Sequence, residues 1–206
     1  LYAQCRAGQR LEVHAAAGGV GLTALEYAQW LSMQQSTTAG RPYKQHSVRC
    51  VAPGGMSCSS RDGGAFAVGL AVQLRKSQLH AVLNSLSLDF IAVSVALLAE
   101  GGCFEEIGKI NIWSTTRMPA AAPTAQYDPL ALDCKIELER EWVSRTLVLL
   151  SARARARVLH GLPRESFDLE REVLTMQIEL EALRRETGRT AQERRTELQA
   201  ALHAKH

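Results

Sequence analysis

The sequence lacks the features of a membrane protein or a nucleic-acid-binding protein. No apolar run is long enough to cross a bilayer, and no basic segment followed by an apolar core opens the chain, so we expect no membrane span and no secretory signal. The formal net charge is only +3, which argues against the broad basic surface that binds nucleic acid. No internal repeat is visible. We therefore expect a globular protein without nucleic-acid or membrane partners.

Cysteine and histidine patterns are also missing. The five cysteines are scattered and form no CxxC pair, and the six histidines show no metal-ligand spacing. The cysteine pattern favours reduced thiols and a cytoplasmic location over a disulfide framework, and the histidine pattern argues against a zinc site. His14 stands at the end of an expected strand, where a packed or hydrogen-bonded side chain is the ordinary interpretation.

The composition of the sequence changes near residue 168. Residues 1–168 alternate apolar runs, amphipathic segments and Gly-rich turns, whereas residues 169–206 are highly charged and contain no proline or aromatic residue. We interpret the first region as one domain and the second as a helical tail.

Strand-like and helix-like segments alternate in the first region. Strands are expected at Leu11–Ala16, Met33–Thr37, Met56–Ser59, Leu79–Asn84 and Cys103–Ile107. Helices are expected at Gly19–Leu31, Tyr43–Cys50, Gly63–Arg75, Leu88–Ala99 and Glu139–Ala152. This alternation predicts an α/β fold, a Rossmann-like doubly wound parallel sheet with helices on both faces. The segment MQQST in the second strand fits poorly, because a central strand should be apolar.

The segment AAGGVG joins the first strand to the first helix. Gly18 and Gly21 occupy the second and third glycine positions of a dinucleotide-binding fingerprint, with Ala16 at the first. Such glycines allow a sharp turn, a close approach of the backbone to a pyrophosphate and tight packing of helix on strand. The N–H groups of the helix N-terminus would face the phosphates. The alternative is that these glycines serve helix–strand packing alone.

The residues about 20 positions further on predict which dinucleotide binds. An NAD-binding chain offers Asp or Glu there to the ribose hydroxyl. Here the segment TTAGRPYK has no acid and contains Arg41 and Lys44, which suit the 2′-phosphate of NADPH. Two solvated surface cations are the alternative.

Five segments together resemble one known family. In order they are HAAAGGVGLTALEYAQWL, TAGRPYK, SSRDGGAFA, LHAVLNSLSLDFIAVSVALLAEGGCFEEIGKINIW and GLPRESFDLE. Over about residues 1–170 they resemble the enoyl reductase domain of modular polyketide synthases. That family belongs to the medium-chain dehydrogenase/reductase superfamily and is related to zinc-free quinone oxidoreductases.

The resemblance implies NADPH-dependent reduction of an α,β-unsaturated thioester held on an acyl carrier protein, as in polyketide or fatty acid synthesis. Hydride passes to the β-carbon, and the α-carbon is protonated. The cofactor-binding residues implied by the resemblance are Ala17, Gly18, Gly19, Val20, Gly21, Thr38, Gly40, Arg41, Lys44, Asn84, Ser85, Leu86 and Gly108. Lys109 and Asp133 match the family's candidates for proton delivery; a solvated lysine and a turn or cap aspartate are the alternatives.

The chain also departs from the family. Family members begin with a GroES-like substrate domain, which this sequence does not contain. We therefore expect the chain to bind NADPH better than it catalyses, unless another chain supplies the missing wall of the cleft. Two other functions stay open: a non-catalytic interaction module and a quinone reductase.

The sequence of the tail predicts one long helix from Leu169 onward. Leu169, Val173, Met176, Leu180 and Leu183 follow one another at spacings of four and three, a coiled-coil seam. The seam ends before Gly188, which weakens a helix. The tail resembles part of the coiled-coil middle domain of ClpB-type disaggregases but has no Walker motif. It could pair with another helix or pack on its own domain.

Overall fold

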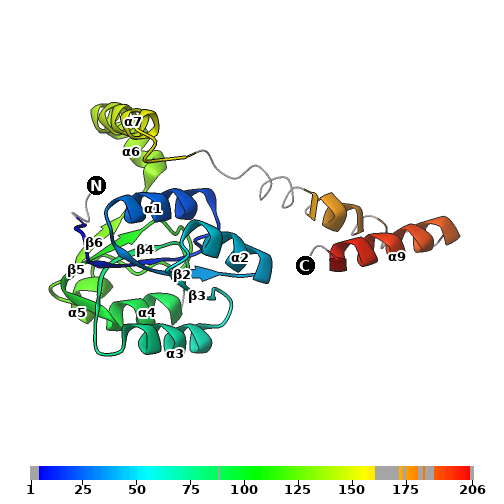
Figure 1. The fold of residues 1–206 in the computed structure, drawn as a ribbon, viewed down its shortest axis with the longest axis horizontal. Helices are drawn as coiled ribbons and strands as arrows, with labels where there is room; N and C mark the ends of the chain where they lie inside the picture. Colours follow the sequence, from blue (N-terminus) through cyan, green and yellow to red (C-terminus); the bar gives the residue numbers. More distant parts are fainter. Residues whose placement is uncertain are drawn as a thin grey trace. The chain divides into compact units, whose positions relative to one another are not determined.

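The computed structural model describes residues 5–87, 89–160, 172–173, 175–180, 183 and 188–204. The chain divides into two compact units, Leu1–His160 and Gly161–His206. The first is an α/β unit and the second is helical where it is described (Figure 1). Leu88, Leu169 and the segment GLPRESFDLE, which the sequence analysis used, lie outside the described residues. None of the described helices has both the length and the apolar character needed to traverse a bilayer.

The α/β unit is built on a six-stranded, all-parallel sheet in the order β3-β2-β1-β4-β5-β6. The strands are β1 (Arg10–Val13), β2 (Gln34–Ala39), β3 (Met56–Ser59), β4 (Leu79–Asn84), β5 (Leu98–Glu106) and β6 (Gln126–Pro129). The helices are α1 (Gly19–Trp30), α2 (Pro42–Val51), α3 (Gly63–Leu74), α4 (Asp89–Ala96), α5 (Arg117–Ala121), α6 (Leu132–Leu138) and α7 (Arg140–Arg155). The predicted Rossmann-like architecture is confirmed.

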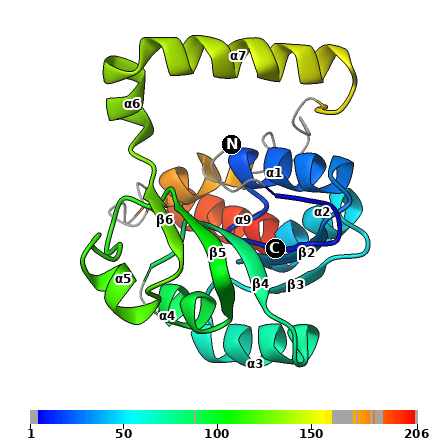
Figure 2. The ribbon, with the colours of Figure 1, turned by 90° about the vertical axis from the view of Figure 1, so that its left-hand side faces the viewer.

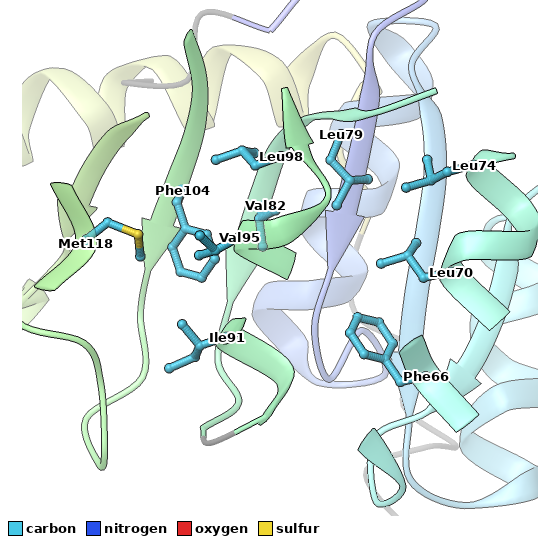
Figure 3. Close-up of a cluster of buried hydrophobic side chains, with 10 residues drawn as sticks. All are labelled: Phe66, Leu70, Leu74, Leu79, Val82, Ile91, Val95, Leu98, Phe104 and Met118. Carbon is cyan, nitrogen blue, oxygen red and sulfur yellow. The ribbon is translucent and has the colours of Figure 1, made fainter. Parts of the chain in front are cut away.

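Helices cover both faces of the sheet, each over its own core. Leu25 of α1 and Val48 of α2 pack with Val13 of β1 on one face. Figure 2 shows α1 and α3 on opposite sides of the sheet. On the α3 and α4 side, Figure 3 shows the larger cluster: Phe66, Leu70, Leu74, Leu79, Val82, Ile91, Val95, Leu98, Phe104 and Met118. The two faces are therefore both buried, as a parallel sheet requires.

The second strand forms despite its polar sequence, because its buried side chains form hydrogen bonds with main-chain groups. Gln35 donates to a carbonyl of α1 at 3.2 Å, and the Thr37 hydroxyl donates to a carbonyl of β3 at 3.1 Å. The Thr38 hydroxyl accepts an N–H from the loop after β1 at 2.9 Å. Hydrogen bonds of this kind remove most of the cost of burying polar groups.

Three short elements, α5, β6 and α6, were not predicted. β6 has the sequence QYDP and α5 the sequence RMPAA, and both contain proline, which usually interrupts such elements. β6 tolerates proline because it lies at the edge of the sheet. α6 and α7 follow, and α7 contacts α1 through Arg153, whose guanidinium lies 4.1 Å from the centroid of the Trp30 ring.

The tail is not one continuous helix. The chain bends at Gly188, and α9 (Arg189–Ala204) follows it. Arg194 Nε lies 2.9 Å from Glu179 Oε1, although 15 residues of straight helix would separate the two by about 22 Å. The prediction of a single long helix is therefore wrong: the chain doubles back, and Val173 and Leu198 are buried within this unit.

Candidate functional site

The candidate site lies at the carboxyl edge of the sheet, where the strand order reverses between β1 and β4. The chain leaves β1 toward the α1 face and leaves β4 toward the α4 face, so the two loops diverge. In doubly wound sheets, ligands bind in the crevice that forms at such a point. The predicted fingerprint residues follow β1, and Asn84 to Leu86 follow β4.

Two glycines of the fingerprint have different roles. A Cβ added to Gly21 would lie 2.6 Å from both the Cα and the carbonyl oxygen of Ala16, so α1 packs too closely on the end of β1 for any side chain. A Cβ on Gly18 would meet only the Ala15 carbonyl oxygen, at an ordinary 3.5 Å. Gly18 is also exposed. Helix–strand packing therefore explains Gly21 but does not explain Gly18.

The N-terminus of α1 is suited to an anion. The helix begins at Gly19, its N-cap Gly18 offers no side-chain hydrogen bond, and its first turn has no acidic residue. The first N–H groups of a helix have no partner within it, and they carry the positive end of the helix dipole. Val20, in this first turn, is 62% exposed, so the turn faces outward from the core.

Three cationic residues follow the ends of β2 and β3. Arg41 precedes α2 and Lys44 lies in its first turn, which has no acid. The positive end of a helix dipole and cationic side chains both attract an anion. Arg61, in the loop after β3, also reaches this point, since a Cβ on Gly40 would lie 3.1 Å from its Nε. The sequence analysis missed Arg61, although parallel pairing of β2 with β3 places the ends of those strands together.

Thr38 positions the loop rather than facing a ligand. Its side chain is completely buried, and its hydroxyl accepts the Ala15 N–H at 2.9 Å. Its carbonyl accepts the Ala16 N–H at 2.8 Å. We therefore assign Thr38 to holding the turn after β1 and do not expect it to contact a phosphate directly.

Asn84 has a similar structural position at the end of β4. It is completely buried; its amide nitrogen donates to the Leu86 carbonyl at 2.8 Å, and its amide oxygen accepts the Leu86 N–H at 3.2 Å. Ser85 donates to the His14 carbonyl at 3.2 Å, which joins the ends of β4 and β1. These bonds hold the turn of Ser85 and Leu86 over the buried side chain of Asn84.

Two further polar side chains are buried beside Asn84. His14 Nδ1 bonds to Asn84 Oδ1, and the Phe66 and Phe90 rings meet its imidazole edge to face. Burial lowers the pKa of His14 to about 4. Glu106, at the end of β5, accepts an amide N–H of Asn84 at 2.6 Å, and burial raises the pKa of its carboxyl group. Glu106 was not predicted, because a lone glutamate in a strand carries no sequence signal.

Lys109 and Asp133, the predicted catalytic residues, lie together. Lys109 Nζ is 2.9 Å from Asp133 Oδ2, and the two side chains are 74% and 62% exposed. The hydrogen bond raises the pKa of Lys109 and lowers that of Asp133. An ammonium group with a raised pKa is a poor acid near neutral pH. It is better suited to stabilising negative charge on a neighbouring oxygen.

Cys5, Cys58 and Cys103 are poorly suited to act as nucleophiles. All five cysteines of the chain are free thiols. Burial raises the pKa of Cys5 and Cys58, and it raises that of Cys103 to about 12, whereas a reactive cysteine needs a lowered pKa. Within the described ranges, no three His, Cys, Asp or Glu side chains are grouped as metal ligands.

Comparisons with known proteins place the α/β unit among relatives. No family model matches the chain. It is 32% identical over 164 residues to polyketide synthase GfsB of Streptomyces halstedii, covering 80% of this chain and 3% of that synthase. The CurK enoyl reductase structure matches with a TM-score of 0.72 at 30% identity, over 78% of this chain and 48% of that one. The nucleotide-binding subdomain of the enoylreductase domain of PpsC from Mycobacterium tuberculosis matches with a TM-score of 0.67 at 25% identity, over 76% of this chain and 88% of that one.

The coverage shows which part of these relatives is present. The chain spans a small fraction of the curated synthase and about half of the CurK enoyl reductase, but most of the PpsC subdomain. The resemblance of the tail to disaggregases finds no support in these three relatives.

Proposed function

Since the α/β unit is a relative of the nucleotide-binding subdomain of polyketide synthase enoyl reductases, we propose that it binds NADPH at the carboxyl edge of its sheet. The observation that carries this proposal is the contrast between Gly21, which packing requires, and Gly18, which packing does not require. An exposed glycine at the N-cap of α1 is accounted for by the close approach of a pyrophosphate.

Each end of the dinucleotide has residues that suit it. We assign the pyrophosphate to the backbone of Ala17 to Gly21, at the positive end of α1. The 2′-phosphate would lie among Arg41, Lys44 and Arg61, next to Gly40. Guanidinium groups bind phosphate oxygens bidentately. The nicotinamide would lie toward Ser85, Leu86 and Gly108, which follow β4 and β5.

The reaction we propose is reduction of an α,β-unsaturated thioester carried by an acyl carrier protein. Bound NADPH supplies hydride to the β-carbon. Lys109, kept protonated by Asp133, would stabilise the negative charge that develops on the thioester oxygen while the α-carbon takes up a proton from solvent water. Lys109 acts here as a fixed charge and not as the acid.

A second domain is needed for catalysis. The chain spans 48% of the CurK enoyl reductase, and we propose that the other wall of the acyl cleft comes from a substrate domain on this or another polypeptide. Without that wall the enoyl group would not be held in a dry, aligned position against the nicotinamide. We therefore expect the isolated chain to bind NADPH with little turnover.

Binding and turnover test the proposal separately. Saturable quenching of intrinsic fluorescence on NADPH titration is expected, with slow oxidation of NADPH when crotonyl thioester is added. A matched substrate domain added in trans should raise that rate. A chain that binds no NADPH would remove the cofactor assignment. Reduction of a quinone in place of the thioester would assign the chain to the quinone reductases.

A further inference from the structure

We propose that His14, Asn84 and Glu106 form a buried relay that positions the nicotinamide half of the dinucleotide by fixing the two turns after β4 and β5. This inference rests on the proposed NADPH site and adds two residues to it, His14 and Glu106. They act through the main chain of the turns and are positioning residues.

The three side chains come from the ends of three neighbouring strands. β1, β4 and β5 are adjacent in the sheet, and Asn84 pairs in register with Glu106. The exposed fractions of His14, Asn84 and Glu106 are 2%, 0% and 1%. Polar groups buried to this degree are costly unless each is hydrogen-bonded, and all three are.

The hydrogen bonds run in one direction. Because the amide oxygen of Asn84 can only accept, His14 Nδ1 must carry the proton of the neutral imidazole. His14 Nε2 is then an acceptor, and the Ser94 hydroxyl lies 3.2 Å from it. The amide nitrogen of Asn84 donates to Glu106 Oε2 at 2.6 Å. The orientation of the Asn84 amide is therefore set from both sides.

The relay ends on two turns of the main chain. On one side, Asn84 bonds to both the N–H and the carbonyl of Leu86. On the other, Glu106 Oε1 accepts the Gly108 N–H at 2.7 Å. A Cβ on Gly108 would also lie 2.7 Å from that carboxylate oxygen, so the carboxyl group and Gly108 fit each other closely. The two turns contain Leu86 and Gly108, the residues assigned to the nicotinamide.

β1 contains another buried carboxyl group, that of Glu12, which serves as a comparison. Glu12 lies two residues before His14 on the same face of β1 and is 1% exposed, yet neither of its carboxyl oxygens has a hydrogen-bond partner in the described part of the chain. Burial of acids in this core therefore does not by itself create a network. The network forms only at the strand ends, where it reaches the two turns.

The test separates the two halves of the cofactor. In Glu106→Gln one acceptor oxygen becomes an NH₂ group facing a donor, either Asn84 or the Gly108 N–H. We expect this variant to bind NADPH about tenfold more weakly, the loss typical of one charged hydrogen bond, and to bind 2′,5′-ADP, the adenosine half, within about twofold of wild type. Gly108→Ala should behave in the same way, because its new Cβ displaces the carboxyl group from the turn.

Glu105→Gln is the matched control, since Glu105 precedes Glu106 on β5 and bonds instead to the Cys103 thiol. Isothermal titration calorimetry with NADPH and with 2′,5′-ADP measures both affinities. The inference is overturned if Glu106→Gln and Gly108→Ala match Glu105→Gln, or if they weaken both ligands equally. If the wild-type chain binds 2′,5′-ADP as tightly as NADPH, the nicotinamide half contributes nothing to binding. The proposed nucleotide site is then retained and the relay alone is contradicted. Wild-type chain that binds neither defeats both.

Discussion

At the scale of single residues, Glu12 has the least favourable surroundings in the core. Its carboxyl group is 1% exposed, the neutral His14 imidazole lies 3.9 Å away at Nε2, and the carboxyl group has no hydrogen-bond partner among the described residues. Burial raises the pKa of Glu12 well above its ordinary 4.5. The protein must therefore either keep this acid protonated or bury a charge, and both destabilise the fold.

Replacing this residue is expected to stabilise the protein. Glu12→Leu should raise the free energy of unfolding by about 1–3 kcal/mol, because it removes a buried polar group that lacks a partner. Urea denaturation monitored by circular dichroism measures the change. A decrease would mean that the carboxyl group has a stabilising role that its surroundings do not show.

The pH dependence of stability gives a second measure of Glu12. An acid whose pKa is raised by folding binds more protons in the native state, so its contribution to stability is present below pH 4.5 and is lost as pH rises toward the folded pKa. The glutamine of Glu12→Gln cannot ionise. The free energy of unfolding of the variant should therefore increase relative to that of wild type as pH rises above 4.5. Comparing the two proteins at each pH cancels the opposite effect of His14, whose pKa of about 4 adds stability as pH rises from 4 to 6.5. A constant difference across this range would contradict the prediction.

At the scale of elements, the start of α1 at Gly19 was predicted where it is observed, because the glycine motif specifies the turn from strand to helix. The strands β3 and β4 were predicted with their observed bounds, and β2 formed despite its polar sequence. The pattern for β2 was weak because main-chain hydrogen bonds replace apolar periodicity there. Sequence patterns failed where elements are too short to show a period, as in α5 and β6.

Two glycine substitutions at this corner should separate stability from binding. Gly21→Ala places a Cβ 2.6 Å from backbone atoms of Ala16 and should lower the free energy of unfolding by about 2 kcal/mol. Gly18→Ala meets only an ordinary contact, so its effect on stability should stay below about 1 kcal/mol while NADPH affinity falls. Thermal unfolding and NADPH titration of both variants check this. If the two substitutions change the stability and the NADPH affinity equally, Gly18 serves helix–strand packing, as Gly21 does, and the prediction is wrong.

At the scale of the whole molecule, the chain forms two compact units. The sequence predicted a helical tail from residue 169, and the second unit begins at Gly161; the coiled-coil seam stays a prediction, although Val173 is buried. The sequence did not predict that the tail folds back, because the Arg194–Glu179 contact joins residues 15 apart and no local pattern reports such a pairing. For the same reason Arg61 and Glu106 escaped notice at the site: each meets its partners only once the strands are aligned.

Deleting residues 161–206 should leave the α/β unit folded. We expect its melting temperature and NADPH affinity to change little, since among the described residues the two core clusters of that unit contain residues before 161. If the tail binds a partner helix, light scattering should show concentration-dependent association of the full chain that the deletion abolishes. Loss of the folded α/β unit on deletion would show that the two units depend on each other.

The most direct test of the account is the ratio of the NADH and NADPH dissociation constants, measured by calorimetry at one ionic strength. Contacts of Arg41, Lys44 and Arg61 with the 2′-phosphate predict that NADPH binds at least about tenfold more tightly, since each hydrogen bond to a charged group contributes about 1.5–3 kcal/mol. Arg61→Ala should reduce that ratio, whereas Arg75→Ala, a cation at the far end of α3, should not. Equal affinities for the two dinucleotides, or binding of neither, would contradict the assignment.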